Sequence, residues 1–136
     1  MLSEDMTIEE IRAFFAQDRF ATEACGAAIV SARHGHAVCE MPLQAAHLNA
    51  MGGVMGGAIF TLADFALAIA CNIGEAPTVS VSNTIEYLST ARGSKLVAEC
   101  STDRSGRSIG HYTVEVRDDQ GTLVAKMCAT CARKSS

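Results

Sequence analysis

The spacing of apolar residues predicts two helices of different character. A capping-box pair, Thr7 and Glu10, accompanies apolar residues at positions 8, 11, 14 and 15, which predicts a short amphipathic helix over about 7–17. Residues 57–71 are rich in Ala and Leu, run to helical length and end just before an asparagine. This second segment is apolar almost all round, and helices of that kind are buried.

Six further segments alternate or are rich in β-branched residues, two before the long helix and four after it. Their links have turn compositions, and sequential strands joined by tight turns predict antiparallel pairing. The long helix then has to lie across the concave face of the sheet. We therefore predict one α+β domain over residues 1–136, with strands within 26–35, 36–43, 77–89, 94–103, 107–118 and 121–133.

One charged residue interrupts the apolar helix. The stretch NAMGGVMGGAIFTLADFALAIACN, residues 49–72, places Asp64 in the middle of a run otherwise suited to burial. An isolated buried carboxylate is costly, so it has to be paired, hydrogen-bonded or neutral. Asp64 is therefore a candidate general base or nucleophile, although a structurally paired or solvated carboxylate would give the same pattern.

The glycines that precede this helix offer backbone donors. The first N–H groups of a helix lack intrahelical acceptors, so the N–H of Gly56 or Gly57 is suited to hold an oxyanion, although Gly-Gly pairs also serve simple close packing. Gly56 and Asp64 are eight residues apart, which is about 12 Å along one helix. They cannot act on the same atom within one chain. If both are catalytic, we expect an obligate dimer in which each site takes one group from each subunit.

Composition narrows the class of protein. The chain has 136 residues and a formal net charge of -4, which gives no basic signature for nucleic acid. Its first ten residues are polar and acidic, which is unlike a secretory signal. The longest apolar run, 58–71, is too short to span a bilayer and contains Asp64. These features predict a soluble cytoplasmic protein with neither a nucleic-acid nor a membrane partner.

Neither the cysteines nor the histidines show the spacing of a metal site. Cys128 and Cys131 form the only close cysteine pair, and odd spacing in a strand places their thiols on opposite faces. The four histidines follow no metal-binding spacing. We expect no metal and no cofactor.

The stretch 49–72 resembles the Asn-x-x-Gly-x-x-His-Gly-Gly…Leu-Ala-Asp-x-Ala signature of hotdog-fold acyl-CoA thioesterases, and most closely the phenylacetate-pathway type. The resemblance implies a hotdog fold, an acyl-CoA substrate, and a homodimer that assembles further into a homotetramer. It implies that Asp64 is the catalytic carboxylate and that the Gly56 N–H binds the thioester oxygen. Asn49 would position the carbonyl or water. Ser82 would orient the water, unless its hydroxyl only bonds to backbone.

The chain departs from the family pattern at Met55, which occupies the position of the family histidine. The Gly56 donor survives this change, but a thioether is only a weak acceptor, so the orienting hydrogen bond of an imidazole is lost. We expect reduced or shifted hydrolase activity. Met55 and Gly57 are also expected to line the substrate site, since methionine adapts to irregular apolar pockets.

The phosphates of CoA need basic contacts. In related enzymes CoA is commonly contacted by the region that corresponds to DRSGRSIGHY, where Arg104 and Arg107 flank Gly106 at a predicted turn. Guanidinium groups suit phosphate, although two solvated surface arginines would look the same. Arg92 is a weaker candidate, and His47 is expected to be a surface loop histidine rather than part of the pocket.

Three functions compete. An acyl-CoA thioesterase is favoured by Asn49, Gly56 and Asp64 together. A non-catalytic acyl-CoA-binding or sensing protein on the same fold is kept open by Met55. A hotdog dehydratase is disfavoured because it typically uses a histidine, which position 55 lacks. The sequence does not indicate the length or the aryl character of the acyl group.

Overall fold

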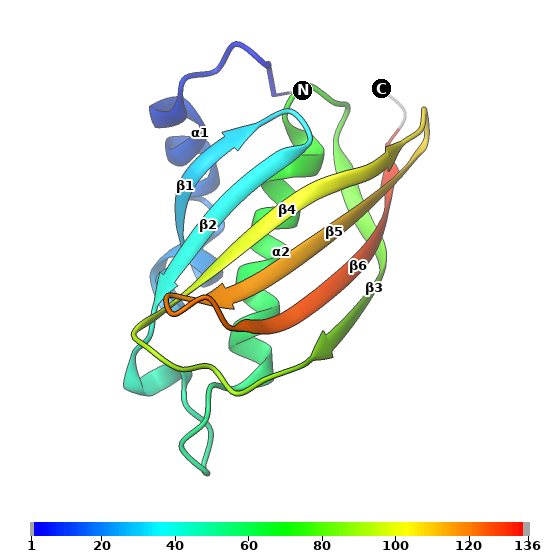
Figure 1. The fold of residues 1–136 in the computed structure, drawn as a ribbon. Coiled ribbons are helices and arrows are strands. Elements are labelled where there is room, and N and C mark those ends of the chain that lie inside the picture. Colours follow the sequence, from blue (N-terminus) through cyan, green and yellow to red (C-terminus); the bar gives the residue numbers. More distant parts are fainter. Residues whose placement is uncertain (1, 135–136) are drawn as a thin grey trace.

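The computed structural model describes residues 2–134 as a curled sheet wrapped around one helix (Figure 1). The prediction of a long helix between two strands and four strands is confirmed. Two short turns of helix, η1 (Phe20–Ala24, π) and η2 (Ala45–His47, 3-10), were not predicted. The remaining elements are α1 (Ile8–Phe15), β1 (Ala28–Arg33), β2 (His36–Pro42), α2 (Gly56–Asn72), β3 (Thr78–Tyr87), β4 (Lys95–Ser105), β5 (Ile109–Asp118) and β6 (Leu123–Arg133).

Helix α1 begins at the predicted capping box. The Thr7 hydroxyl accepts a hydrogen bond from the Glu10 N–H at 3.2 Å, and the Glu10 carboxylate accepts one from the Thr7 N–H at 2.9 Å. Two backbone donors that a helix start would otherwise leave free are satisfied in this way. The helix buries Ile11 and its last residue, Phe15, whereas the neighbouring Phe14 is exposed.

The six strands pair antiparallel in the order β1-β2-β4-β5-β6-β3. The expectation that sequential strands pair is wrong for β3, because α2 carries the chain from β2 across to the far edge of the sheet. There β3 pairs with β6, while β2 pairs directly with β4. Within residues 2–134, the outer edge of β3 has no strand beside it, and Val79 and Val81 on it are 48% and 66% exposed.

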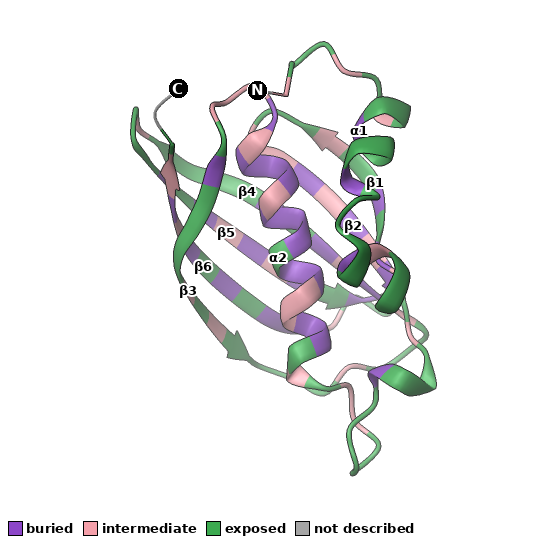
Figure 2. Ribbon diagram, turned by 180° about the vertical axis from the view of Figure 1, so that it is seen from behind, coloured by how far each residue is buried: buried purple, intermediate pink, exposed green. Residues whose placement is uncertain are grey.

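Helix α2 lies on the concave face, flanked by α1 on one side and by β3 on the other (Figure 2). Ten of its residues are buried, including Leu62, Ala66 and Ile69 against the sheet. Burial all round was predicted, but one stripe is exposed or half-buried, because no element within residues 2–134 covers the helix there. This outer stripe of α2 consists of Gly57, Phe60, Thr61, Asp64, Ala68 and Asn72.

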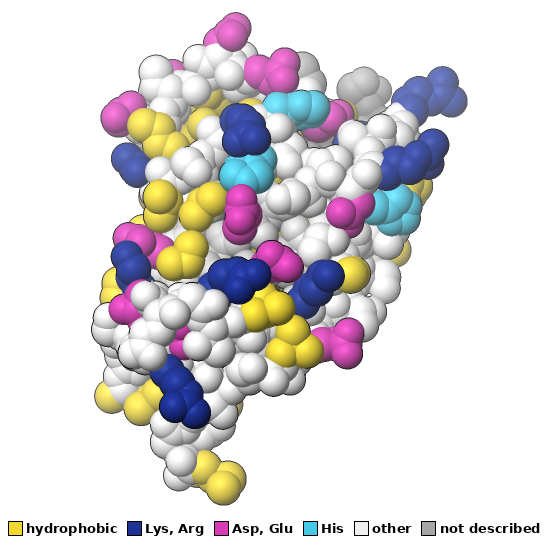
Figure 3. All heavy atoms as spheres, in the orientation of Figure 1, with side chains coloured by type: hydrophobic (Ala, Val, Ile, Leu, Met, Phe, Trp, Pro, Cys, Tyr) yellow, Lys and Arg dark blue, Asp and Glu magenta, His cyan; other side chains and the backbone are white. Residues whose placement is uncertain are grey.

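The outer face of the sheet is polar and charged. Basic and acidic side chains stand side by side on it (Figure 3), and they include the pairs Lys95–Glu40 at 3.0 Å and His36–Glu99 at 2.7 Å. As predicted for β6, Cys128 is exposed on one face and Cys131 is buried on the other. No helix within residues 2–134 is long and apolar enough to cross a membrane.

Candidate active site

Asn49 organises the loop that precedes α2. Its side-chain carbonyl accepts hydrogen bonds from the N–H groups of Met51 at 3.0 Å and Gly53 at 3.1 Å. Gly52, at the turn, has φ of +85°, a conformation that glycine adopts at no steric cost. The loop projects beyond the N-terminal end of α2 (Figure 1), and at its tip the Met51 side chain is 95% exposed.

Helix α2 starts without a side-chain cap. Met55 is the N-cap residue and supplies no acceptor, so the first N–H groups, those of Gly56 and Gly57, point out of the helix end as donors. The Tyr87 hydroxyl donates to the Gly56 carbonyl at 3.0 Å. A Cβ on Gly56 would lie 3.1 Å from the Tyr87 Cζ and Oη atoms, so glycine permits this close approach.

His47 anchors the same loop from inside. It is buried, not a surface residue as expected, because both ring nitrogens have backbone partners. The Gln44 N–H donates to Nδ1 at 3.0 Å, and Nε2 therefore carries the proton that it donates to the Cys25 carbonyl at 2.8 Å. The His47 carbonyl accepts from the Met55 N–H at 2.8 Å, which fixes the residue before the helix.

Asp64 lies on the outer stripe of α2, where its carboxylate faces a hollow of about 360 Å³. Phe20, Phe60 and Phe65 make much of this hollow apolar, and Asp18, just beyond α1, also lines it. Partial burial, and then the nearby Asp18 carboxylate, raise the pKa of Asp64 above that of an ordinary aspartate. A carboxylate with a raised pKa is a better proton acceptor once ionised, which suits a general base.

The structure separates Asp64 from the other predicted site residues. Asn49 and Gly56 line a different hollow of about 460 Å³, together with Tyr87 and neighbouring residues. The two hollows share no lining residue. This agrees with the helical spacing of about 12 Å between Gly56 and Asp64. Within one chain, therefore, the candidate acid and the candidate donor do not face a common point.

The register of β3 gives different positions to its two serines. Ser82 lies opposite Thr130, whose hydroxyl is 3.5 Å from His111 on the outer face of the sheet. Ser80 lies opposite the buried Cys131, on the side of the sheet that carries α2. An irregularity between the two serines shifts the register, so simple alternation fails there. The two serines therefore lie on either side of this irregularity, and neither lines the hollow that Asp64 faces.

The predicted CoA-binding turn joins β4 to β5. Arg104 and Arg107 are both exposed, and the Gly106 N–H donates to the Ile109 carbonyl at 2.8 Å to close the turn. A Cβ on Gly106 would lie 2.8 Å from that carbonyl oxygen, which explains the glycine. Figure 1 places this turn at the end of the sheet where α2 finishes, opposite the loop around Asn49.

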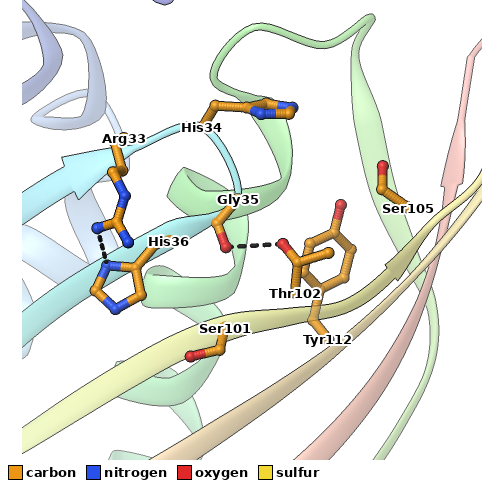
Figure 4. Close-up of a pocket in the computed structure, with 8 residues that line it drawn as sticks. All are labelled: Arg33, His34, Gly35, His36, Ser101, Thr102, Ser105 and Tyr112. Carbon is orange, nitrogen blue, oxygen red and sulfur yellow. Dashed lines mark hydrogen bonds between the residues drawn. The ribbon is translucent and has the colours of Figure 1, made fainter.

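A polar hollow of about 410 Å³ lies at that end as well (Figure 4). The Thr102 hydroxyl donates to the Gly35 carbonyl at 2.8 Å, and the Arg33 guanidinium lies 3.0 Å from Nδ1 of His36. The other residues that line this hollow are His34, Ser101, Ser105 and Tyr112. Asn49, Gly56 and Asp64 take no part in it, so it is separate from the candidate catalytic groups.

Comparison with known proteins agrees with this arrangement. A family model described as the thioesterase superfamily matches residues 51–125. Escherichia coli acyl-coenzyme A thioesterase PaaI is 35% identical over 104 residues, which cover 76% of this chain and 74% of that protein. Human acyl-coenzyme A thioesterase 13 is 33% identical over 102 residues, which cover 72% of this chain and 73% of that protein.

A solved structure resembles almost the whole chain. The PaaI protein of the E. coli phenylacetic acid degradation operon superposes with a TM-score of 0.83 at 27% identity, over 96% of this chain and 98% of that one. Its likeness covers α1 as well as the sheet and α2, beyond the segment that the family model matches. The chain therefore belongs to the thioesterase superfamily, and its antiparallel sheet wrapped around α2 is the hotdog fold of PaaI-type thioesterases.

Proposed function

We propose that this protein is an acyl-CoA thioesterase, which hydrolyses a thioester to a carboxylate and free CoA. The observation that carries the proposal is the position of Asp64, a carboxylate of raised pKa and the one charged residue of the outer stripe of α2, facing a hollow that a ligand can enter. The names of the E. coli and human relatives support the same activity.

We further propose that each site is built from two subunits. Asp64 comes from one protomer, and the uncapped Gly56 N–H comes from its partner, because the two groups are about 12 Å apart within one chain. The free edge of β3 supports this assembly, since an unpaired strand with exposed Val79 and Val81 invites antiparallel pairing with a second copy. Two α2 helices running antiparallel across the two-fold axis would bring Gly56 of one subunit to Asp64 of the other.

The chemistry follows from these two groups. As a general base, Asp64 takes a proton from water while the water oxygen attacks the thioester carbonyl carbon. The resulting oxyanion accepts a hydrogen bond from the partner's Gly56 N–H, and the proton held by Asp64 passes to the departing CoA sulfur. As a nucleophile, Asp64 would attack the carbonyl carbon and break the C–S bond, releasing CoA thiolate and leaving a mixed anhydride that water then cleaves to the acid and free Asp64. In either route Asn49 positions the carbonyl or the water beside Gly56.

A hydroxyl near Asp64 would orient the attacking water. Neither serine of β3 lines the hollow that Asp64 faces within one chain, so we propose that the partner's β3 supplies this hydroxyl, with Ser82 as the predicted residue. For the CoA phosphates we propose Arg104 and Arg107, which stand exposed beyond the C-terminal end of α2, while Gly106 shapes their turn.

Met55 supports a second candidate, a non-catalytic acyl-CoA-binding protein. Its side chain gives α2 no cap and provides only a weakly accepting sulfur where the family pattern has an imidazole. The remaining groups, Asp64 and the Gly56 N–H, are sufficient for hydrolysis, so we rank this candidate second and expect a thioesterase with reduced turnover.

The deciding experiment measures free-thiol release from short, medium, long and aryl acyl-CoAs. We expect turnover by the wild-type protein and its loss in Asp64→Asn, with the dimer preserved in sedimentation. Ser80→Ala, on the other side of the irregularity in β3, serves as a matched control and should retain activity where Ser82→Ala loses part of it. Binding of acyl-CoA without any thiol release by the wild type would overturn the thioesterase and favour the binding protein.

A further inference from the structure

The outer stripe of α2 continues as an apolar path beyond Asp64. Ala68 lies one turn further along and lines the same hollow as Asp64. Asn72, one more turn along, lines a second hollow of about 400 Å³. The other walls of the second hollow are Leu2, Phe14, Phe15, Glu75 and Pro77.

Aromatic rings in edge-to-face contact connect the walls of the two hollows. Phe15 of the second hollow meets Phe65 of the first edge to face, with ring centroids 6.3 Å apart. Phe14 extends the wall, at 5.1 Å from Phe15. On the helix side, the small Ala68 side chain stands between the hollows, and the amide of Asn72 donates to its carbonyl at 2.8 Å and so is held against the helix. The two hollows share no lining residue, but they follow each other along α2 beside the N-terminal segment, and we call the pair of hollows the groove.

We propose that this groove is the binding site for a straight acyl chain of about ten carbons, which runs from the thioester at Asp64 past Ala68 to Asn72. The inference rests on the proposed function, since it takes Asp64 as the reacting end. Asp64 and Asn72 are eight residues apart, or about 12 Å along the helix. A zigzag of carbon–carbon bonds of about 1.5 Å advances roughly 1.25 Å per carbon, so about ten carbons span the groove. A long, narrow path of this kind fits a linear chain better than a single aromatic ring.

The far end of the groove is polar and would stop a longer chain. Glu75 stands there and pairs with His34 at 2.7 Å and with the buried Arg133 at 3.2 Å. The methylene groups of a longer acyl chain would have to leave the groove at this point. They would gain no further apolar contact, because the neighbouring groups are charged. Affinity should therefore stop rising with chain length at about ten carbons.

A second subunit would supply the roof. If the partner's Gly56 lies at Asp64 with the two helices antiparallel, the partner's loop projects over the C-terminal half of α2, above Ala68. Three large apolar residues of this loop are exposed: Leu48 is 44%, Met51 95% and Met55 55% exposed. In this arrangement their side chains meet the open side of the groove, and the methionines adapt to whichever chain lies beneath them.

The test measures equilibrium binding of non-hydrolysable thioethers, S-butyl-CoA and S-decyl-CoA, so that it does not depend on turnover. Each buried methylene raises affinity by up to about fourfold. We expect S-decyl-CoA to bind the wild type at least 30-fold more tightly than S-butyl-CoA, with no further gain for S-hexadecyl-CoA. Ala68→Phe fills the groove, and Phe14→Glu places a charge at its far wall; each should reduce the ratio to below about fivefold.

A matched control separates the groove from general surface effects. Phe14 and Val30 are both 46% exposed, and Val30 lies on β1 away from the groove, so Val30→Glu should keep the full ratio. Phe14→Glu changes an exposed position and tests the proposal even if Ala68→Phe does not fold. A wild-type ratio near one, a ratio kept by Phe14→Glu, or tighter binding of S-phenylethyl-CoA than of S-decyl-CoA would overturn the groove. Absence of thiol release from acyl-CoAs would count against the proposed function alone.

Discussion

Replacing Gly56 with proline removes a single hydrogen-bond donor from the proposed site. Proline is favoured at the first position of a helix because its missing N–H has no intrahelical acceptor there. The preceding residue, Met55, has φ of -62° and ψ of 135°, an extended conformation that a following proline accepts. Gly56→Ala is the matched control, since it adds the same Cβ beside Tyr87 at 3.1 Å but keeps the N–H.

Loss of one oxyanion donor typically lowers kcat by about 10²–10³-fold, or about 2.7–4 kcal/mol. We expect that difference between Gly56→Pro and Gly56→Ala, with both variants folded and dimeric. The Gly56→Pro homodimer then has two defective sites, and so has the Asp64→Asn homodimer. A heterodimer of the two variants combines both defects in one site and leaves the other site intact.

The assay compares purified, doubly tagged heterodimers with each parent by thiol release. With one intact site of two, the heterodimer should recover about half of the wild-type activity, while each parent stays at or below about 1%. A heterodimer no more active than the mean of its parents would refute the two-subunit site. That result would mean that the Gly56 N–H and the Asp64 carboxylate act within one chain, which the separation of about 12 Å along α2 does not allow.

Three further predictions concern single side chains. Asp18→Asn removes a negative charge that raises the pKa of Asp64, so the acid limb of the pH profile of kcat/KM should move to lower pH; a move upward would contradict the pairing. Gly57→Ala has open space, with Met55 Sδ at 4.0 Å as its nearest contact, and should raise the free energy of unfolding in urea by up to about 1 kcal/mol. His47→Ala should lower the free energy of unfolding by about 2–4 kcal/mol, because its two backbone hydrogen-bond partners are left unsatisfied. His111 is exposed, so His111→Ala is the control and should change the free energy of unfolding by less than about 0.5 kcal/mol.

Local pattern was sufficient for most of the fold. The capping box at Thr7 and the apolar run before Asn72 define helices because their determinants lie within a few residues of one another. Alternation in β6 correctly placed Cys128 and Cys131 on opposite faces. The pairing of β3 with β6 was missed, because which edge a strand joins depends on how the chain crosses the sheet and leaves no trace in the strand itself.

The candidate site was predictable in its residues and less so in its surroundings. The spacing of Gly56 and Asp64 already implied that the two groups cannot act on the same atom within one chain, and in the structure they line different hollows. The shift of β3 between Ser80 and Ser82 depends on its pairing with β6, so alternation along the strand alone does not give the face on which Ser82 lies. Asp18 is distant in sequence from Asp64, and only the packing of the N-terminal segment against α2 brings their carboxylates into one hollow.

The lack of a side-chain cap at the N-terminus of α2 also affects how this protein can be engineered. A Ser or Asp at an N-cap adds about 1 kcal/mol by accepting a hydrogen bond from the second or third N–H of the helix, here that of Gly57 or Ala58. Met55 makes no such hydrogen bond, so α2 lacks this stabilisation. Placed at position 55, an aspartate would bring a negative charge beside the neighbouring Gly56 N–H that we propose for the thioester oxygen, and would repel the developing oxyanion. A screen for heat resistance alone would therefore select a variant that a screen for turnover rejects.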